Sequence, residues 1–199
     1  MPPSQSSKLS PAAVIGPGRV GLALAIFLDR IGTEITVGTR SERGRQRVEA
    51  AGLTVAGPTE ATRGASLVIL AVPDDELPSL VTALAADGAF AAGQVVIHTA
   101  GVDGPGLLAP AAAAGARTAA CHPVQIFNDD LEATLGRLPG TVWGSPATRR
   151  ARRSWPPWAA GRWTCPSRAG SATTPPWCWR PTAAPPCPPP PPTSCGPAA

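Results

Sequence analysis

One turn constrains the fold of this chain more than any other segment. An apolar run at residues 12–15 leads into glycines at positions 16, 18 and 21, and an apolar helical pattern continues to Leu28. Glycines at this spacing, between a strand pattern and a helix pattern, are the fingerprint of a dinucleotide-binding turn. The first makes the tight turn, the second lets the backbone approach a pyrophosphate, and the third lets helix and strand pack closely. We therefore predict a cofactor-binding turn made of Gly16, Pro17, Gly18, Arg19, Val20 and Gly21.

The tip of the second predicted strand indicates which cofactor the turn serves. Domains that bind NAD usually carry an acidic residue here for the ribose 2′-hydroxyl. In this chain the tip reads Thr39, Arg40 and Ser41, with Arg43 and Arg45 close behind and no carboxylate at the tip itself. Arginine offers a planar fork of donors that suits a 2′-phosphate. We expect NADP as the cofactor, with NAD as the alternative; the competing interpretation is that these arginines belong to a solvated helix start.

Strand and helix patterns alternate along the chain as far as residue 143. Apolar runs predict strands at residues 12–15, 34–38, 53–55, 67–72, 94–98, 117–121 and 140–143. Helical spacing predicts helices at residues 19–30, 42–51, 75–85 and 107–114. Apolar strands separated by helices are typical of a parallel sheet that is covered on both faces. We therefore predict an α/β protein with a doubly wound, mostly parallel Rossmann-like sheet, whose ligands bind beyond the carboxyl ends of the strands.

The C-terminal segment has a composition from which no ordinary core can be built. Residues 144–199 use only eight residue types: Gly, Ser, Pro, Ala, Thr, Arg, Trp and Cys. Every codon for these types has G or C in the middle position, as a GC-rich gene read out of frame would produce. We therefore predict a disordered N-terminus at 1–10, an NAD(P)-binding domain at 11–145, and an out-of-frame, disordered tail at 146–199. A genuine Pro-rich disordered tail is the alternative.

Charge and cysteine placement argue against several classes of function. Residues 144–199 hold seven arginines and no acidic residue, so the net charge of +4 comes from the tail and is not a nucleic-acid signal. The four cysteines of the tail have no paired Cys-x-x-Cys spacing, and Cys121 is expected to be a small buried residue. No segment has a signal-peptide pattern or the length of a membrane span. We expect a cytoplasmic protein with no metal, nucleic-acid or membrane partner.

Four short segments together resemble a known family. They are residues 14–21 (VIGPGRVG), 71–74 (AVPD), 98–101 (HTAG) and 121–127 (CHPVQIF). They resemble the Rossmann-like oxidoreductase-related proteins that carry a C-terminal helical domain of unknown function. That group is similar to pyrroline-5-carboxylate reductase, ketopantoate reductase and deazaflavin-dependent NADP reductases. The resemblance covers about residues 12–145 and implies a helical second domain that completes the substrate cleft; in this sequence that domain is absent or scrambled.

Both histidines lie at the ends of predicted strands, at the edge of the sheet where ligands bind. His98 and His122 are therefore candidate catalytic residues, because imidazole relays protons near neutral pH. The alternative for each is a histidine that only hydrogen-bonds a loop backbone. Val72 and Pro73 are expected to shape the loop over the cofactor, and Thr99 is expected to reach the nicotinamide or its ribose through its hydroxyl.

These observations lead to three hypotheses about function. The first is an NADP-dependent oxidoreductase acting on an unknown small-molecule substrate, in which the cofactor supplies the hydride and the protein supplies position and electrostatics. The second is a non-catalytic dinucleotide-binding module, and the third is a truncated, inactive product of a frame-shifted gene. The family resemblance implies a homodimer formed through the domain that is missing here.

Overall fold

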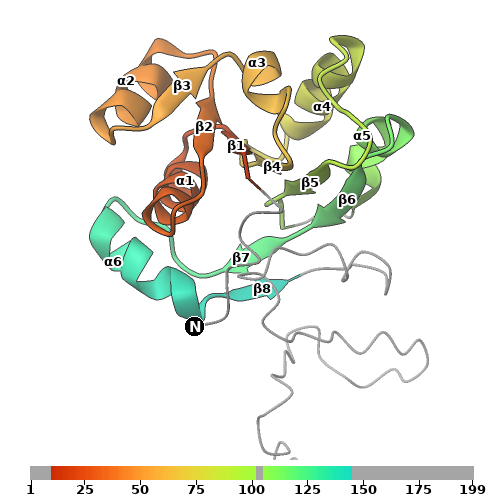
Figure 1. Cartoon of the computed structure of the whole chain (residues 1–199). Helices are drawn as coiled ribbons and strands as arrows, with labels where there is room; N and C mark the ends of the chain where they lie inside the picture. The colour runs from red at the N-terminus through yellow and green to blue at the C-terminus, as the bar shows by residue number, and fades with distance from the viewer. Residues whose placement is uncertain (1–9, 102–104, 145–199) are drawn as a thin grey trace, which may run out of the picture. The chain divides into compact units, whose positions relative to one another are not determined.

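The structure, a computed structural model, describes residues 10–101 and 105–144 (Figure 1). Its main sheet contains β1 (Ala12–Ile15), β2 (Ile35–Gly38), β3 (Thr54–Ala56), β4 (Leu67–Leu70), β5 (Val95–His98) and β6 (Arg117–Ala120). A separate pair contains β7 (His122–Val124) and β8 (Val142–Gly144). The helices are α1 (Arg19–Arg30), α2 (Glu42–Ala50), α3 (Pro58–Thr62), α4 (Leu77–Ala86), α5 (Ala109–Ala113) and α6 (Leu131–Arg137), with the 3₁₀ helices η2 (Pro105–Leu108) and η3 (Leu138–Gly140).

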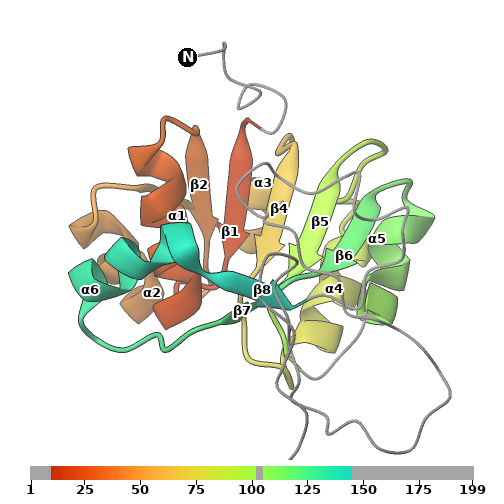
Figure 2. The same cartoon turned by 90° about the horizontal axis from the view of Figure 1, so that it is seen from below.

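The main sheet is entirely parallel, in the order β3-β2-β1-β4-β5-β6. The chain first builds outward from β1 to β3 and then returns to the other side of β1, where β4 pairs with it and Ile15 lies beside Leu70. Figure 2 shows β2, β1, β4, β5 and β6 side by side in this order. Ligands of doubly wound sheets bind in the crevice at such a reversal, beyond the carboxyl ends of the strands. The predicted α/β fold with a doubly wound, mostly parallel sheet is confirmed.

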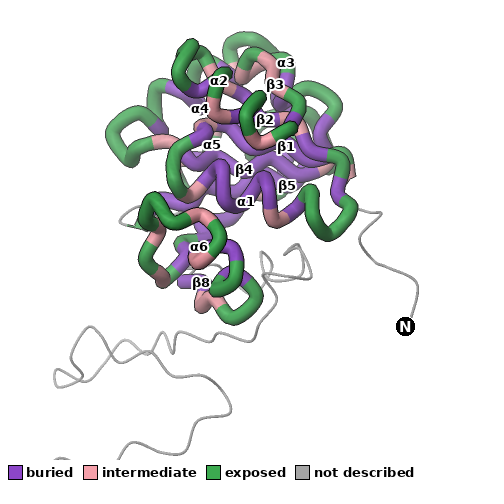
Figure 3. The backbone as a smooth tube through the Cα atoms, turned by 90° about the vertical axis from the view of Figure 1, so that its left-hand side faces the viewer, coloured by how far each residue is buried: buried purple, intermediate pink, exposed green. Residues whose placement is uncertain are grey.

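The central strands β1, β4 and β5 are buried on both faces, which explains their continuous apolar runs. In β1, Ala12 and Val14 belong to a core that includes residues of α1, α2 and α6. Ala13 and Ile15 point the other way, into a core shared with α3, α4 and α5. Figure 3 shows the central strands and much of α1 as buried, and the outer helices as largely exposed. The two helical layers therefore leave only the ends of the strands open to ligands.

Helix α1 spans the residues that the sequence predicts, Arg19–Arg30. It is buried at almost every position from Gly21 to Leu28 because it lies between the sheet and α6. Gly32, which follows the C-cap residue Ile31, has a φ of +82° and donates its N–H to the carbonyl of Asp29 over 2.8 Å. A glycine in this conformation is a common helix C-terminal cap.

Several short elements depart from the predicted pattern. The strand predicted at residues 140–143 is β8, which pairs antiparallel with β7 and does not extend the parallel sheet. The sequence pattern does not predict β7, α3 or α6, which contain three, five and seven residues. Elements this short do not complete enough periods for strand and helix to be told apart. The helix predicted at residues 107–114 is divided between η2 and α5.

Several predictions about the ends of the chain stay untested. The tail at 146–199 lies outside the described residues, as does the predicted N-terminal segment except for Ser10. Within the described ranges, no helix combines the length and the apolar character needed to cross a membrane. The same ranges contain no group of three or more His, Cys, Asp or Glu side chains that is arranged to hold a metal ion.

Candidate functional site

The turn after β1 requires glycine at position 16. Gly16 has a φ of +97°, a conformation that residues with side chains rarely adopt. A Cβ atom there would lie 2.7 Å from the carbonyl oxygen of Ala71 and 2.8 Å from Cγ1 of Val72. The N–H of Gly16 donates to the carbonyl of Gly38 over 2.9 Å. The carboxyl ends of β1, β2 and β4 therefore meet at this glycine.

Gly21 and Gly18 are glycines for different reasons. A Cβ on Gly21 would clash with the carbonyl oxygen of Gly16 and lie 3.1 Å from Cβ of Ala71, so a side chain would push α1 away from the turn. A Cβ on Gly18 would meet no atom closer than the oxygen of Ala71, at 4.0 Å. Gly18 also has a φ of −68°, which any residue adopts. The fold tolerates a side chain at position 18, and the space beside Gly18 is open.

A cavity of about 700 Å³ lies along this turn. This volume falls within the range of small-molecule and cofactor sites. Nine of the predicted cofactor-binding residues line it: Gly16, Pro17, Gly18, Arg19, Thr39, Arg40, Ser41, Val72 and Pro73. Of the other three, Gly21 is enclosed where α1 meets the turn, and Val20 and Thr99 line a second cavity. The fold thus brings the glycine turn and the tip of β2 to a single cavity.

The lining of this first cavity carries an excess of positive charge. Its charged residues are four arginines and two carboxylates: Arg19, Arg40, Arg43, Arg47, Glu76 and Asp129. The sequence pattern points to Arg45, but Arg45 pairs with Glu42 at 3.7 Å and does not line the cavity. Arg47 takes its place, because Arg47 follows Arg43 by one helical turn and lies on the same face of α2. This spacing is visible in the sequence, but it identifies Arg47 only when the face of α2 that lies toward the cavity is known.

The hydroxyl groups at the tip of β2 are organised by the start of α2. Ser41 is the N-cap of α2, and its Oγ accepts the N–H of Gly44 over 3.0 Å. The N–H of Ser41 donates to Oγ1 of Thr39 over 3.3 Å, and the two hydroxyl oxygens lie 3.4 Å apart. At least one hydroxyl proton remains able to donate into the cavity, because a hydroxyl is both donor and acceptor. The residues that organise the start of α2 therefore also form part of the wall of the first cavity.

The second cavity, of about 540 Å³, contains His122. Its lining residues are Val20, Thr99, His122, Pro123, Val124, Gln125, Ile126 and Phe127. The Nδ1 atom of His122 lies 2.9 Å from the carbonyl oxygen of Thr99. Because a carbonyl oxygen only accepts hydrogen bonds, Nδ1 carries a proton in this contact, which leaves Nε2 as the nitrogen available to a ligand. The arrangement provides an oriented imidazole beside the hydroxyl-bearing Thr99.

Comparison with a family model shows which protein family this chain belongs to. Residues 2–123 match the model of the Rossmann-like domain. The chain belongs to the Rossmann-like domain family. The match covers the main sheet and ends within β7, just past His122.

Several solved structures have a fold similar to that of this Rossmann-like domain. Mycobacterium tuberculosis 3-hydroxyisobutyrate dehydrogenase with L-serine is 16% identical, with a TM-score of 0.62 over 75% of this chain and 50% of that one. Streptomyces aurantiacus imine reductase is 21% identical, with a TM-score of 0.57 over 72% and 49%. Aspergillus terreus reductive aminase, in complex with NADPH4, cyclohexanone and allyl amine, is 19% identical, with a TM-score of 0.53 over 70% and 49%. The chain thus spans about half the length of these proteins.

The other histidine of the Rossmann-like domain is placed differently from His122. His98 is the last residue of β5 and is fully buried. Strand alternation puts its side chain on the face of Val96, which packs in the core shared with α4 and α5. His98 lines neither cavity. This placement favours the structural alternative for His98, whose catalytic role stays a prediction.

Cys121 lies between β6 and β7 and is buried, as the sequence analysis expects. Burial raises the pKa of the Cys121 thiol to about 12. The thiolate is the reactive form of cysteine, so Cys121 stays an uncharged thiol near neutral pH. It contributes to packing and offers no nucleophile to the neighbouring cavity.

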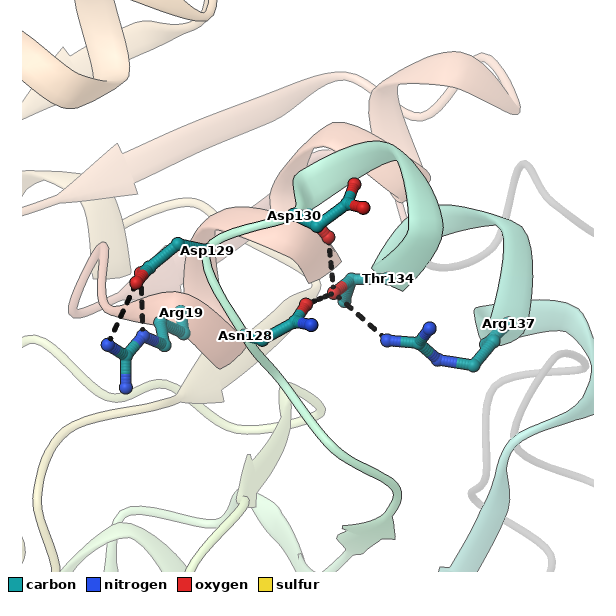
Figure 4. A network of polar contacts seen from close by, with 6 residues as sticks. All are labelled: Arg19, Asn128, Asp129, Asp130, Thr134 and Arg137. Carbon is teal, nitrogen blue, oxygen red and sulfur yellow. Dashed lines mark hydrogen bonds and ion pairs between the residues drawn. The ribbon is translucent and has the colours of Figure 1, made fainter.

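An ion pair that the sequence analysis missed closes one side of the first cavity. Arg19 Nε lies 2.9 Å from Oδ1 of Asp129, and Arg19 Nη2 lies 3.3 Å from Oδ2. Figure 4 shows Asp129, in the loop before α6, facing Arg19 on the first turn of α1. The hydrogen bonds and charge of Arg19, together with the charge of Arg47, hold the pKa of Asp129 below its usual value. A carboxylate therefore stands ionised beside the helix end where an anion would bind.

Replacing Asp129 by asparagine is expected to raise the affinity for NADPH about fivefold. The substitution keeps the side-chain shape, removes a negative charge that repels phosphate, and frees Arg19 to face a ligand. Fluorescence titration with NADPH at low salt measures the change, and raising the salt concentration is expected to shrink it.

Glu132→Gln is the matched control for this change. Glu132 in α6 pairs with Arg30 of α1 at 2.7 Å, but it does not line the cavity. Its substitution is expected to leave the affinity unchanged. Equal effects of the two substitutions would mean that Asp129 acts only by docking α6.

Proposed function

We propose that this chain binds NADP(H) in the first cavity and reduces or oxidises a small substrate in the second. The observation that carries the proposal is the coincidence of the glycine turn with an arginine-rich wall in one cavity. Gly18 leaves open space there, and the first N–H groups of α1 have no side-chain cap. Both features suit a pyrophosphate group, because uncapped N–H groups and the helix dipole attract anions.

In this proposal the arginines distinguish the two nicotinamide cofactors. Arg40, Arg43 and Arg47 hold the 2′-phosphate of NADP(H), aided by the hydroxyls at the tip of β2. Val72 and Pro73, which follow β4, form the facing wall against which the cofactor packs. The N-terminus of α1 holds the pyrophosphate.

The second cavity is the proposed place of reaction. A bound nicotinamide ring supplies or accepts the hydride. Val20 of the glycine turn lines this cavity together with Thr99, and Nε2 of His122 holds or moves the proton that accompanies hydride transfer. The contact of Nδ1 with Thr99 keeps the imidazole in one orientation for that role.

Titration of the full chain with NADPH and with NADH tests the proposal. We expect NADPH to bind about ten- to a hundredfold more tightly, because a charge-assisted contact with the 2′-phosphate has no counterpart in NADH. Isothermal calorimetry gives both dissociation constants under identical conditions. Binding of neither cofactor would overturn the proposal, and equal binding of both would overturn the choice of NADP.

A dinucleotide-binding module without turnover is the second candidate, because the described residues that line the first cavity include none of those that line the second. A version of the gene with the reading frame restored after Trp143 separates the candidates. Cofactor binding by both versions with turnover by the restored one alone would identify the present chain as the truncated product of a frame-shifted gene. In that case a homodimer is expected only for the restored version.

A further inference from the structure

One side chain of the second cavity has polar atoms that nothing in the described structure satisfies. Gln125 lines this cavity, and both its Nε2 and its Oε1 are inaccessible to water and have no hydrogen-bond partner among the described residues. Buried side-chain amides are normally hydrogen-bonded, because leaving them unpaired is unfavourable.

The chain shows how it satisfies a buried amide elsewhere. Gln94 is buried and donates from Nε2 to the carbonyls of Thr62, at 3.0 Å, and Ala65, at 2.8 Å. Its Oε1 accepts the N–H of Ala91 over 2.9 Å. Gln94 is therefore a structural amide, whereas Gln125 lies beside a cavity with its full hydrogen-bonding capacity unused.

The loop that carries Gln125 is held firmly, so the unsatisfied amide is not the result of a loose segment. Arg137 donates to the carbonyl of Ile126 over 3.0 Å. Thr134 Oγ1 lies 3.2 Å from Oδ1 of Asn128 and 2.9 Å from the carbonyl of Asp130. Figure 4 shows the contacts of Thr134 with Asn128 and Asp130 in the preceding loop. The backbone is anchored directly after Gln125.

The chemistry of the second cavity limits what can pair with this amide. Among its described lining residues none is permanently charged, and His122 is the one that can gain a charge. The other lining side chains are mostly apolar, including Val20, Ile126 and Phe127. An ionised carboxylate has no arginine or lysine to meet here and would lose its hydration. An uncharged group that both donates and accepts hydrogen bonds fits.

We propose that Gln125 recognises a primary carboxamide in the second cavity. Two amides can pair through reciprocal N–H···O bonds, and rotation about the side-chain bonds of Gln125 turns its amide toward the ligand. The carboxamide belongs either to the nicotinamide ring of the cofactor or to the substrate. The inference rests on the proposed function, in which ring and substrate meet in this cavity.

Three probes of the same shape test the proposal on the full chain: benzamide, benzoate and acetophenone. Amide NMR spectra during titration follow binding through the signals of the described part of the chain. We expect benzamide to bind about tenfold more tightly than the other two, because acetophenone lacks the donor and benzoate is charged. Gln125→Met is expected to remove this preference, and Gln94→Met is expected to keep it.

Thermal unfolding separates recognition from folding. Gln125→Met replaces an unsatisfied amide by an apolar side chain of similar size, so we expect an unfolding midpoint equal to or above that of the wild type. Gln94→Met removes three hydrogen bonds and is expected to lower the midpoint. A lowered midpoint for Gln125→Met would contradict the proposal.

Repeating the benzamide titration with saturating NADPH distinguishes the two sources of the carboxamide. Displacement of benzamide assigns the group to the nicotinamide ring, and continued binding assigns it to the substrate. The titration without cofactor tests Gln125 even if NADPH does not bind, so failure of the proposed function is distinguishable. Equal affinities for the three probes, or an unchanged preference in Gln125→Met, would overturn the inference.

Discussion

Replacing Gly18 by valine is expected to abolish NADPH binding, with a loss of more than about a hundredfold in affinity, and to leave the fold intact. The nearest atom to a Cβ at position 18 is 4.0 Å away, and the φ of −68° suits valine, so the protein itself accommodates the side chain. The two methyl groups would instead occupy the space in the first cavity where a pyrophosphate approaches the backbone. Calorimetric titration measures the loss, and circular dichroism checks the fold.

Gly21→Val is the contrasting substitution. Its Cβ would clash with the carbonyl oxygen of Gly16, a backbone atom that cannot move aside without shifting the turn. We expect it to destabilise the fold by about 3 kcal/mol or more, the upper range for overpacking. Unfolding in urea compares the two variants. Retained NADPH affinity in Gly18→Val would show that the turn serves the fold alone.

Replacing Arg40 by alanine is expected to weaken NADPH binding about ten- to a hundredfold and to change NADH binding by less than about twofold. Arg40 lies at the tip of β2 and lines the first cavity. Its guanidinium is proposed to bind the 2′-phosphate, and a charge-assisted contact of this kind contributes about 1.5–3 kcal/mol. Parallel titrations with both cofactors measure the difference.

Arg45→Ala provides a control of identical charge change on the same segment. Arg45 is turned away from the cavity and pairs with Glu42 at 3.7 Å. It is expected to have little effect on either cofactor, so a general loss of positive charge is separated from a specific contact. Equal losses of NADPH and NADH affinity in Arg40→Ala would exclude Arg40 as the 2′-phosphate ligand.

Features that are set by residues close together in the sequence were predictable. The bounds of α1 follow from the glycine turn before it and Gly32 after it, both of which act locally. The parallel sheet follows from apolar runs such as 67–70 and 95–98, because strands covered on both faces need no polar alternation. The grouping of the turn with the tip of β2 follows from the parallel pairing of β1 with β2.

Features that depend on distant segments were not predictable in the same way. Choosing Arg47 over Arg45 requires knowing which face of α2 lies toward the cavity, and the core position of Val48 decides that face. Asp129 meets Arg19 across 110 positions of the chain, and no local pattern encodes this contact. The same holds for β7 and β8, three-residue strands that pair across the intervening α6, which itself packs on α1.

By itself, the sequence of this chain determined an α/β fold, the glycine turn and the prediction of a dinucleotide cofactor for that turn. Each of these follows from the spacing of residues within single strand–turn–helix units. The tertiary structure alone decided that His98 is enclosed while His122 lines a cavity, although the sequence places both at strand ends. It also decided that the amide of Gln125 is left unsatisfied. The physical reason is that burial and hydrogen-bond partnership are properties of the space around a side chain, which segments far apart in the sequence fill together.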